Sequence, residues 1–211
     1  ITWVTGVQTC ALPIFQAVGF DLDALRLGKL KATQLRVRMP DGTWIDTEQV
    51  DRLPAALELA QLLADDDQAV LLHVALPLEQ ANGNNCLFEG GRADRPMRYC
   101  QSWREVQDLY ADEVQSIGVL EHALSLRLQR DDNADYMTCP VARLVRDGQG
   151  AWSLDPAYVP PLLSFAAHPG LLNQLDNLLT QLSAKRQRLM GMRRESNQRM
   201  ADFAVADVSL F

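Results

Sequence analysis

The sequence predicts a mainly β protein with an α-helical appendage, in which an N-terminal β-sandwich is followed by one long helix. Two observations support this fold class. Apolar and polar residues alternate with a period of two in several runs between residues 30 and 154, with turn motifs between the runs. From residue 171 to about residue 200, apolar residues instead recur every three or four positions, which is typical of a helix. Strands followed by a helix indicate separate β and helical parts.

The first fourteen residues fit neither pattern. Residues 4–14, VTGVQTCALPI, resemble a peptide translated from sequencing adapter. We therefore expect residues 1–14 to be a non-native segment that contributes nothing to the core, as an expression scar would. If so, the native N-terminus is missing from this sequence.

From residue 15 the chain reads as a folded protein. Phe20–Asp23 and Leu30–Met39 are expected to be half-buried strands, with a short helical turn between them that ends at Gly28. The PDGT motif at residues 40–43 predicts a tight turn, because proline presets one dihedral angle and glycine accepts a positive φ. Residues 44–46 are then the return strand, and Asp41 is interpreted as a turn former rather than a catalytic carboxylate.

The next segment surrounds a buried strand. Residues 53–63 fit either an extended segment or a helical turn, and the three adjacent carboxylates at 65–67 indicate a solvated loop rather than a cation site. Val70–Pro77 is an apolar run of strand length, which predicts a central strand buried on both faces. His73 within it is interpreted as a core or edge histidine rather than a general base. Residues 82–96 are expected to form a long surface loop.

Three further segments complete the predicted sandwich. Residues 97–109 and 136–146 alternate as strands, with Pro140 indicating an edge or a bulge. Residues 114–130 fit helix or strand, and the period of two in their second half favours strand. Asp147–Gly150 predicts a hairpin turn with a return strand at 151–154. The layout therefore has about eight strands.

The C-terminal helix carries a leucine stripe in the alternating four-and-three spacing of a heptad seam. Lys185 occupies one seam position and Gly191 weakens the repeat. A stripe of this length needs a partner helix, which lies either in the same chain or in another copy. Asp207 resembles the N-cap of a following helix. The residues predicted to form an oligomerisation seam are Leu171, Leu175, Leu178, Leu182 and Leu189.

Composition limits the function classes. The formal net charge of −7 argues against general nucleic-acid binding and against anionic-membrane binding. Residues 166–211 are net positive, which we interpret as a solvated basic helix face. No apolar run approaches the length of a membrane span. The four cysteines have neither disulfide nor metal spacing. No phosphate loop, zinc pair or nucleophile elbow occurs, so no catalytic, cofactor-binding or metal-binding residue is predicted.

Four stretches together are similar to the TssK family, the baseplate adaptor of the bacterial type VI secretion system. The last two stretches are the most specific, and the resemblance spans residues 15–211. The stretches are Met39–Thr43, Tyr136–Leu144, Leu154–Pro161 and Ala201–Phe211.

The resemblance implies a structural, non-enzymatic protein without cofactors. Residues 15–165 would be a β-sandwich shoulder domain, similar to that of phage receptor-binding proteins. Residues 166–211 would begin a helical neck, and a C-terminal head domain would be absent. The family implies a homotrimer whose shoulder binds other baseplate subunits and whose head binds membrane-complex subunits. Its location would be cytoplasmic, at the cytoplasmic face of the inner membrane, without insertion.

Two alternatives from other classes remain. One is a stand-alone β-sandwich binding domain with a coiled-coil oligomerisation helix. The other is a metal-independent hydrolase, which no motif supports.

Overall fold

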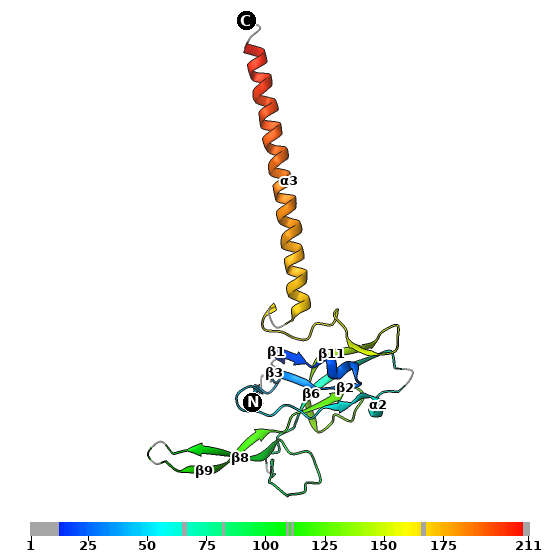
Figure 1. Cartoon of the computed structure of the whole chain (residues 1–211), viewed down its shortest axis with the longest axis vertical. Helices are drawn as coiled ribbons and strands as arrows, with labels where there is room; N and C mark the ends of the chain where they lie inside the picture. Colours follow the sequence, from blue (N-terminus) through cyan, green and yellow to red (C-terminus); the bar gives the residue numbers. More distant parts are fainter. Residues whose placement is uncertain are drawn as a thin grey trace, which may run out of the picture. The chain divides into compact units, whose positions relative to one another are not determined.

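The computed structural model describes residues 13–64, 67–81, 83–108, 110, 112–165 and 168–208; of these, the side chains of Pro169 and of residues 195–208 are not described. The chain forms two compact units, Ile1–His168 and Pro169–Phe211. The first unit contains all the labelled strands and two short helices, and the second consists of helix α3, Pro169–Val208 (Figure 1).

The first sheet has the order β1-β3-β4 and is antiparallel. Its strands are β1 (Ile14–Phe20), β3 (Ala32–Arg38) and β4 (Trp44–Asp46). Between β1 and β3, helix α1 (Leu22–Arg26) is capped by Asp21, whose Oδ1 accepts hydrogen bonds from the N–H groups of Asp23 and Ala24 at 3.1 and 2.9 Å. Gly28 ends the turn with a φ of 77°, the left-handed conformation that glycine adopts without strain.

The second sheet is built around β6, Ala69–Pro77, which lies between β10 (Ser125–Leu128) and β11 (Tyr136–Arg146). Strand β12 (Trp152–Leu154) pairs with the outer side of β11. The prediction of a central strand at Val70–Pro77 is thus confirmed. The β6–β11 register shifts between Pro140 and Ala142, so Pro140 lies at a bulge, as its missing N–H favours.

Both sheets contribute to one hydrophobic core. Phe15, Leu35 and Val37 from the first sheet and Leu72 and Leu144 from the second are fully buried in a single cluster. Side chains from two sheets that meet in a shared core form a sandwich-like arrangement. The predicted fold class, mainly β with a C-terminal helix, is therefore confirmed.

The remaining strands form two small sheets. Strand β2 (Lys29–Leu30) pairs with β5 (Leu57–Glu58), which runs directly into helix α2 (Leu59–Leu62). Residues 53–63 were predicted to be either extended or helical, and they contain both, as strand β5 and helix α2. The last sheet has the order β7-β8-β9, with β7 at Cys86–Leu87, β8 at Tyr99–Gln107 and β9 at Val114–His122.

Three sequence expectations need correction. Phe20–Asp23 is not a strand, because Phe20 ends β1 and Asp21 caps α1. The eight expected strands are twelve in the part of the chain that the structure describes: the runs 30–39 and 114–130 each divide into two strands, and the short strands β5 and β7 form within segment 53–63 and within the expected loop 82–96. Asp207 does not start a new helix, because α3 continues without a break from Pro169 to Val208.

Candidate functional site

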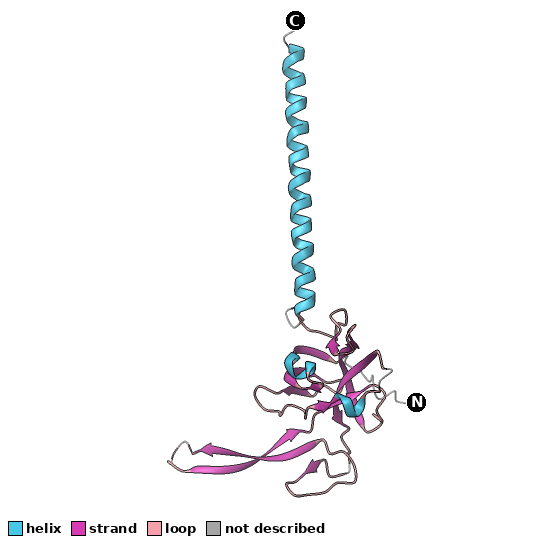
Figure 2. Ribbon diagram, turned by 45° about the vertical axis from the view of Figure 1, so that its right-hand side comes forward, coloured by secondary structure: helices cyan, strands magenta, loops and turns pink. Residues whose placement is uncertain are grey.

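Strands β8 and β9 form a long two-stranded ribbon that extends away from the other sheets (Figure 2). Several exposed apolar side chains of the β unit lie on this ribbon. The register of this ribbon is unbroken from the Tyr99–His122 pair to the Gln107–Val114 pair. Strand β7 pairs with the first two residues of β8, so among the residues that the structure describes the outer part of the ribbon consists of two strands. A two-stranded ribbon is marginally stable in water unless something packs against it.

Apolar side chains project from both faces of this ribbon. Directly paired residues share a face, so Trp103, Val114 and Leu120 lie on one face, and Val106 and Ile117 lie on the other. All five are between 44% and 61% exposed. A sheet with one solvated face normally presents polar residues there. Apolar groups on both faces therefore indicate a surface that other protein covers.

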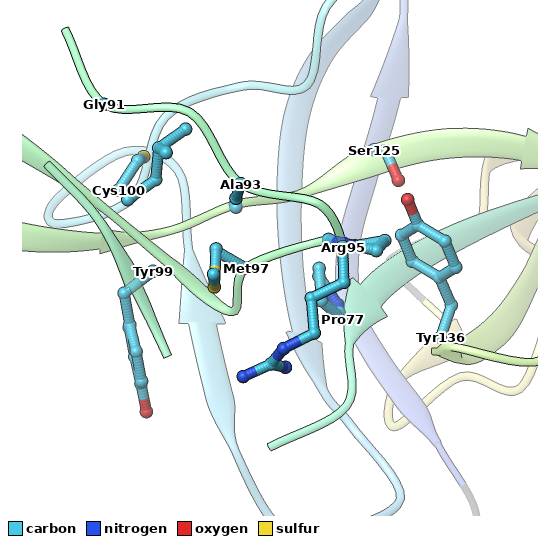
Figure 3. A pocket seen from close by; sticks show the side chains of 12 residues that line it. Pro77, Gly91, Ala93, Arg95, Met97, Tyr99, Cys100, Ser125 and Tyr136 are labelled. Atoms are coloured by element: carbon cyan, nitrogen blue, oxygen red, sulfur yellow. The ribbon is translucent and has the colours of Figure 1, made fainter. Parts of the chain in front are cut away.

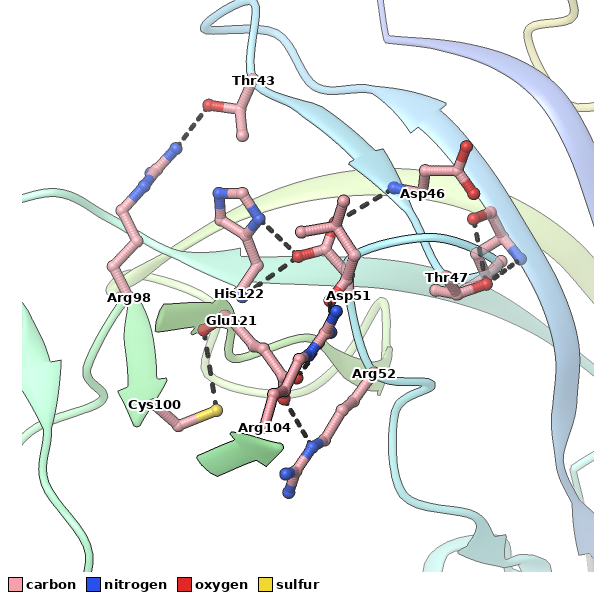
Figure 4. Close-up of polar contacts among 12 residues, drawn as sticks. Thr43, Asp46, Thr47, Asp51, Arg52, Arg98, Cys100, Arg104, Glu121 and His122 are labelled. Atoms are coloured by element: carbon pink, nitrogen blue, oxygen red, sulfur yellow. Dashed lines mark hydrogen bonds and ion pairs between the residues drawn. The ribbon is translucent and has the colours of Figure 1, made fainter. Parts of the chain in front are cut away.

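The base of the ribbon is held to the sandwich by buried acids (Figure 4). The side chain of Glu121, in β9, is 4% exposed and lies between two arginines. Arg52 Nε is 2.5 Å from one of its oxygens, and Arg104 Nη2 is 3.0 Å from the other. Arg104 also donates to the carbonyl of Val50 at 2.7 Å. The loop after β4 and the ribbon are thereby joined by charge-assisted contacts.

A second acid strengthens the same junction. Asp51 Oδ1 lies 2.8 Å from His122 Nδ1 and accepts the backbone N–H of His122 at 3.2 Å. Its Oδ2 accepts the backbone N–H of Asp46 at 3.0 Å. Burial alone would raise the pKa of Asp51, but the hydrogen bonds from His122 and Asp46 hold it below its ordinary value. The carboxylate therefore stays ionised at neutral pH and fixes the ribbon's base.

Asp41 has two roles. Its Oδ1 accepts the Thr43 N–H at 2.9 Å, and Gly42 next to it has a φ of 90°, so the predicted turn is confirmed. Its Oδ2 also lies 2.5 Å from Nη2 of Arg98, a residue only 2% exposed. Arg98 donates further to Thr43 Oγ1 and to the carbonyl of Pro77. The sequence carries no signal for this ion pair, because its partners are 57 positions apart.

A cavity of about 290 Å³ lies beside the ribbon's base (Figure 3). Its wall is mainly apolar and includes Pro77, Met97 and Tyr136. Cys100 also lines it, but desolvation raises the pKa of this thiol, so the thiolate needed for nucleophilic chemistry is disfavoured.

The structure places the other predicted residues as follows. His73 lies in β6, where desolvation lowers its pKa and favours the neutral form. Asp67 pairs with Arg130, while Asp65 and Asp66 lie outside the described residues, as do residues 1–12 and 209–211. Among the described residues, no three His, Cys, Asp or Glu side chains are grouped to hold a metal. Within the same residues, no helix is long and apolar enough to cross a membrane.

All five seam leucines lie in α3. Leu171 and Leu175 are partly buried, and Leu178, Leu182 and Leu189 are more than half exposed in the single chain. Sequence reasoning found this surface but missed the ribbon. The signal was present, because β9 places apolar residues at both odd and even positions, which no single buried face can accommodate.

The fold combines a β-sandwich with a long helix and is held together by buried ion pairs. It exposes apolar side chains on the ribbon and on α3, which is typical of a protein that contacts other proteins. Comparison with known proteins gives the family. The profile described as "Bacterial Type VI secretion, VC_A0110, EvfL, ImpJ, VasE" matches residues 15–211, so the chain belongs to this type VI secretion family, the TssK family.

Individual relatives agree. The Pseudomonas aeruginosa type VI secretion system baseplate component TssK1 is 32% identical over 181 residues, which are 84% of this chain and 39% of that protein. A chain in a structure of the type VI baseplate complex is 50% identical to this protein. The match covers 95% of this chain and 45% of that chain, with a TM-score of 0.79. A chain of the TssK-TssF-TssG subcomplex is 46% identical over 84% of this chain and 58% of its own, with a TM-score of 0.77. This chain thus spans about two fifths of the length of its curated relative.

Proposed function

We propose that this protein is a structural subunit of a type VI secretion baseplate and acts through protein contacts rather than catalysis. The observation that carries the proposal is the match to a chain of the baseplate complex at 50% identity over 95% of this chain. In this proposal residues 15–165 are the shoulder domain and residues 166–211 begin the neck. The proposed non-native segment is residues 1–14, although its last residue, Ile14, is the first residue of β1 and pairs with Arg38.

The proposed assembly is a homotrimer held by the α3 seam. Leu178, Leu182 and Leu189 are 51–56% exposed in the single chain. Burying a leucine side chain fully contributes roughly 1.5–3 kcal/mol, so the seam favours association with other helices. Lys185 at one seam position packs its aliphatic stem on neighbouring helices while its ammonium reaches solvent. The threefold symmetry is taken from the family resemblance.

The proposed partners follow from the relatives. One relative's structure is a TssK-TssF-TssG baseplate subcomplex, which supports contact between this β unit and other baseplate subunits. The exposed ribbon and the cavity at its base are surfaces suited to such contact. Contact with membrane-complex subunits would use a head domain that follows the neck, on the cytoplasmic side of the inner membrane.

A complementation experiment tests the proposal. Deleting the gene should abolish secretion by the type VI system of the source cell, and the full-length protein should restore it. A full-length variant with Leu178→Ala and Leu182→Ala should be folded yet fail to restore secretion. Normal secretion in the deletion strain would overturn the proposed function.

A further inference from the structure

Helix α3 changes in character near its midpoint. Its alternating four-and-three spacing assigns the leucine stripe to heptad positions a and d, and the helix runs without a break, so the lettering holds along it. From residue 171 to 182 these positions are leucines, and the flanking e and g positions are uncharged. From residue 185 cations occupy the same rows, and we call residues 185–194 the basic segment. The cations in these rows are Lys185 at d, Arg186 and Arg193 at e, and Arg188 at g.

The charge of the basic segment is not balanced within it. Its ten residues carry five cations and no acid over about 15 Å of helix. A solvated basic face, as interpreted from composition, fits only the fifth cation, Arg194, which is at position f on the opposite side of the helix from the stripe. The other four lie on or beside the stripe, next to Leu189 and Met192, which are 56% and 57% exposed. Cations set into an exposed apolar stripe indicate a contact surface that requires a particular charge on its partner.

This arrangement opposes pairing with a second copy. In a parallel pair of heptad helices, the residue at g contacts the residue at e of the following heptad on the other helix. Self-pairing would therefore place Arg188 beside Arg193 of the second copy, and Lys185 beside Lys185. In the first half of the helix the same rows bring only leucine and glutamine together. Because like charges at facing positions destabilise association, α3 favours a second copy over residues 171–182 and disfavours one over the basic segment.

The described part of the chain contains no other helix that could cover the basic segment. Helices α1 and α2 have five and four residues, whereas the segment has ten. A docked helix with Asp or Glu at its own e and g positions would pair with Arg188 and Arg193, and its apolar residues would bury Leu189 and Met192. A nucleic-acid backbone offers the negative charge but no apolar stripe, and a lipid surface would bury Arg186 and Arg193 together with the apolar residues.

We propose that the basic segment docks an acidic amphipathic helix of another protein in the assembly, and not a second copy of α3. The unbalanced charge of the segment and the apolar residues beside it identify this partner. The inference rests on the proposed function, because it takes the association of copies through α3 from there and assigns that association to residues 171–182. Leu189, which the predicted seam includes, then contacts the acidic helix.

Co-expression of two differently tagged full-length copies tests this charge selection. One copy is wild type, and the other serves as the acidic helix because its basic segment is reversed in charge. In native mass spectrometry the ratio of mixed to unmixed oligomers should exceed the random value at least about threefold in about 50 mM salt, and approach it in about 500 mM salt. The matched control is Arg194→Glu, which reverses one charge at position f and should mix randomly in both. The reversed copy carries Lys185→Glu, Arg186→Glu, Arg188→Glu and Arg193→Glu.

Thermal unfolding of each protein alone identifies the source of the acidic helix. If the proposal is correct, the reversed copy unfolds at the same temperature as wild type, and when isolated from cells it lacks a subunit that wild type and Arg194→Glu both recover. A clearly lower unfolding temperature for the reversed copy alone would overturn the proposal, because a later segment of the same chain would then cover the cations. Random mixing of oligomers in low salt would overturn this inference alone, whereas recovery of monomers only would overturn it together with the proposed seam.

Discussion

Asp41→Asn should destabilise the β unit although Asp41 lies at a surface turn. The substitution keeps an oxygen that can accept the Thr43 N–H, so the turn itself is preserved. It removes the negative charge 2.5 Å from Arg98, whose side chain is 2% exposed, and so leaves a buried cation without its counter-ion. Breaking a buried pair in this way costs about 3–5 kcal/mol. Because the Asp41 side chain is 30% exposed, we expect a smaller loss, with Asp41→Asn lowering the free energy of unfolding by about 2–3 kcal/mol.

The stability difference between wild type and Asp41→Asn should depend on pH with a defined sign. Burial acts to raise the pKa of Asp41, but the hydrogen bonds from Thr43 and Arg98 and the charge of Arg98 lower it below 3.8 overall. A carboxyl whose pKa is lower in the folded state stabilises the protein above its unfolded pKa and loses that contribution as pH falls through the folded value. The stability difference between wild type and Asp41→Asn should therefore be full at pH 7 and shrink below about pH 3.8.

Urea denaturation of the full-length protein, followed by circular dichroism at pH 7 and pH 3, measures both effects. Asp23→Asn is the control, because its carboxylate is 91% exposed and pairs only with Arg26. Such surface pairs contribute less than about 1 kcal/mol. If Asp41→Asn and Asp23→Asn had the same unfolding free energy, the Arg98 pair would not be a stabilising element of this fold.

Three further predictions concern the helix, the core and the ribbon. The Leu178→Ala and Leu182→Ala double variant should lose several kcal/mol of association free energy and sediment as smaller species, whereas Gln181→Ala should sediment as wild type. Burial raises the pKa of Cys139 to about 12, so this thiol should resist alkylation at pH 8 in the folded protein and react only in denaturant; rapid labelling of the native protein would contradict its placement in the core. Glu121→Gln should lower the free energy of unfolding by about 2 kcal/mol and speed amide hydrogen exchange in β9. Unchanged exchange would mean that the ion pairs of Glu121 with Arg52 and Arg104 do not hold the ribbon.

Local patterns were sufficient to predict much of the fold. The apolar run at Val70–Pro77 became the central strand β6, and the PDGT and Asp147–Gly150 motifs became turns, because each depends on neighbouring residues alone. The leucine spacing likewise predicted α3. Phe20–Asp23 was misassigned because its alternation continues β1, whereas the capping of α1 by Asp21 competes with extension.

The contact surfaces depend on tertiary placement, which the patterns do not contain. Nothing in the sequence near Glu121 indicates that Arg52 and Arg104 meet at its carboxylate, because those arginines come from different segments. The exposure of Trp103 and Ile117 also depends on how far the ribbon extends past β7. Alternation identified these residues as strand, but only the sheet order shows that, among the described residues, the outer part of the β8–β9 ribbon has no third strand beside it.

Native mass spectrometry of complexes isolated from cells through a tag on the full-length protein tests the central proposal most directly. A structural baseplate subunit should be recovered in multiples of three copies together with other baseplate subunits of the type VI system. Recovery of the protein as a monomer, or as a self-assembled oligomer without any baseplate subunit, would contradict the proposed role.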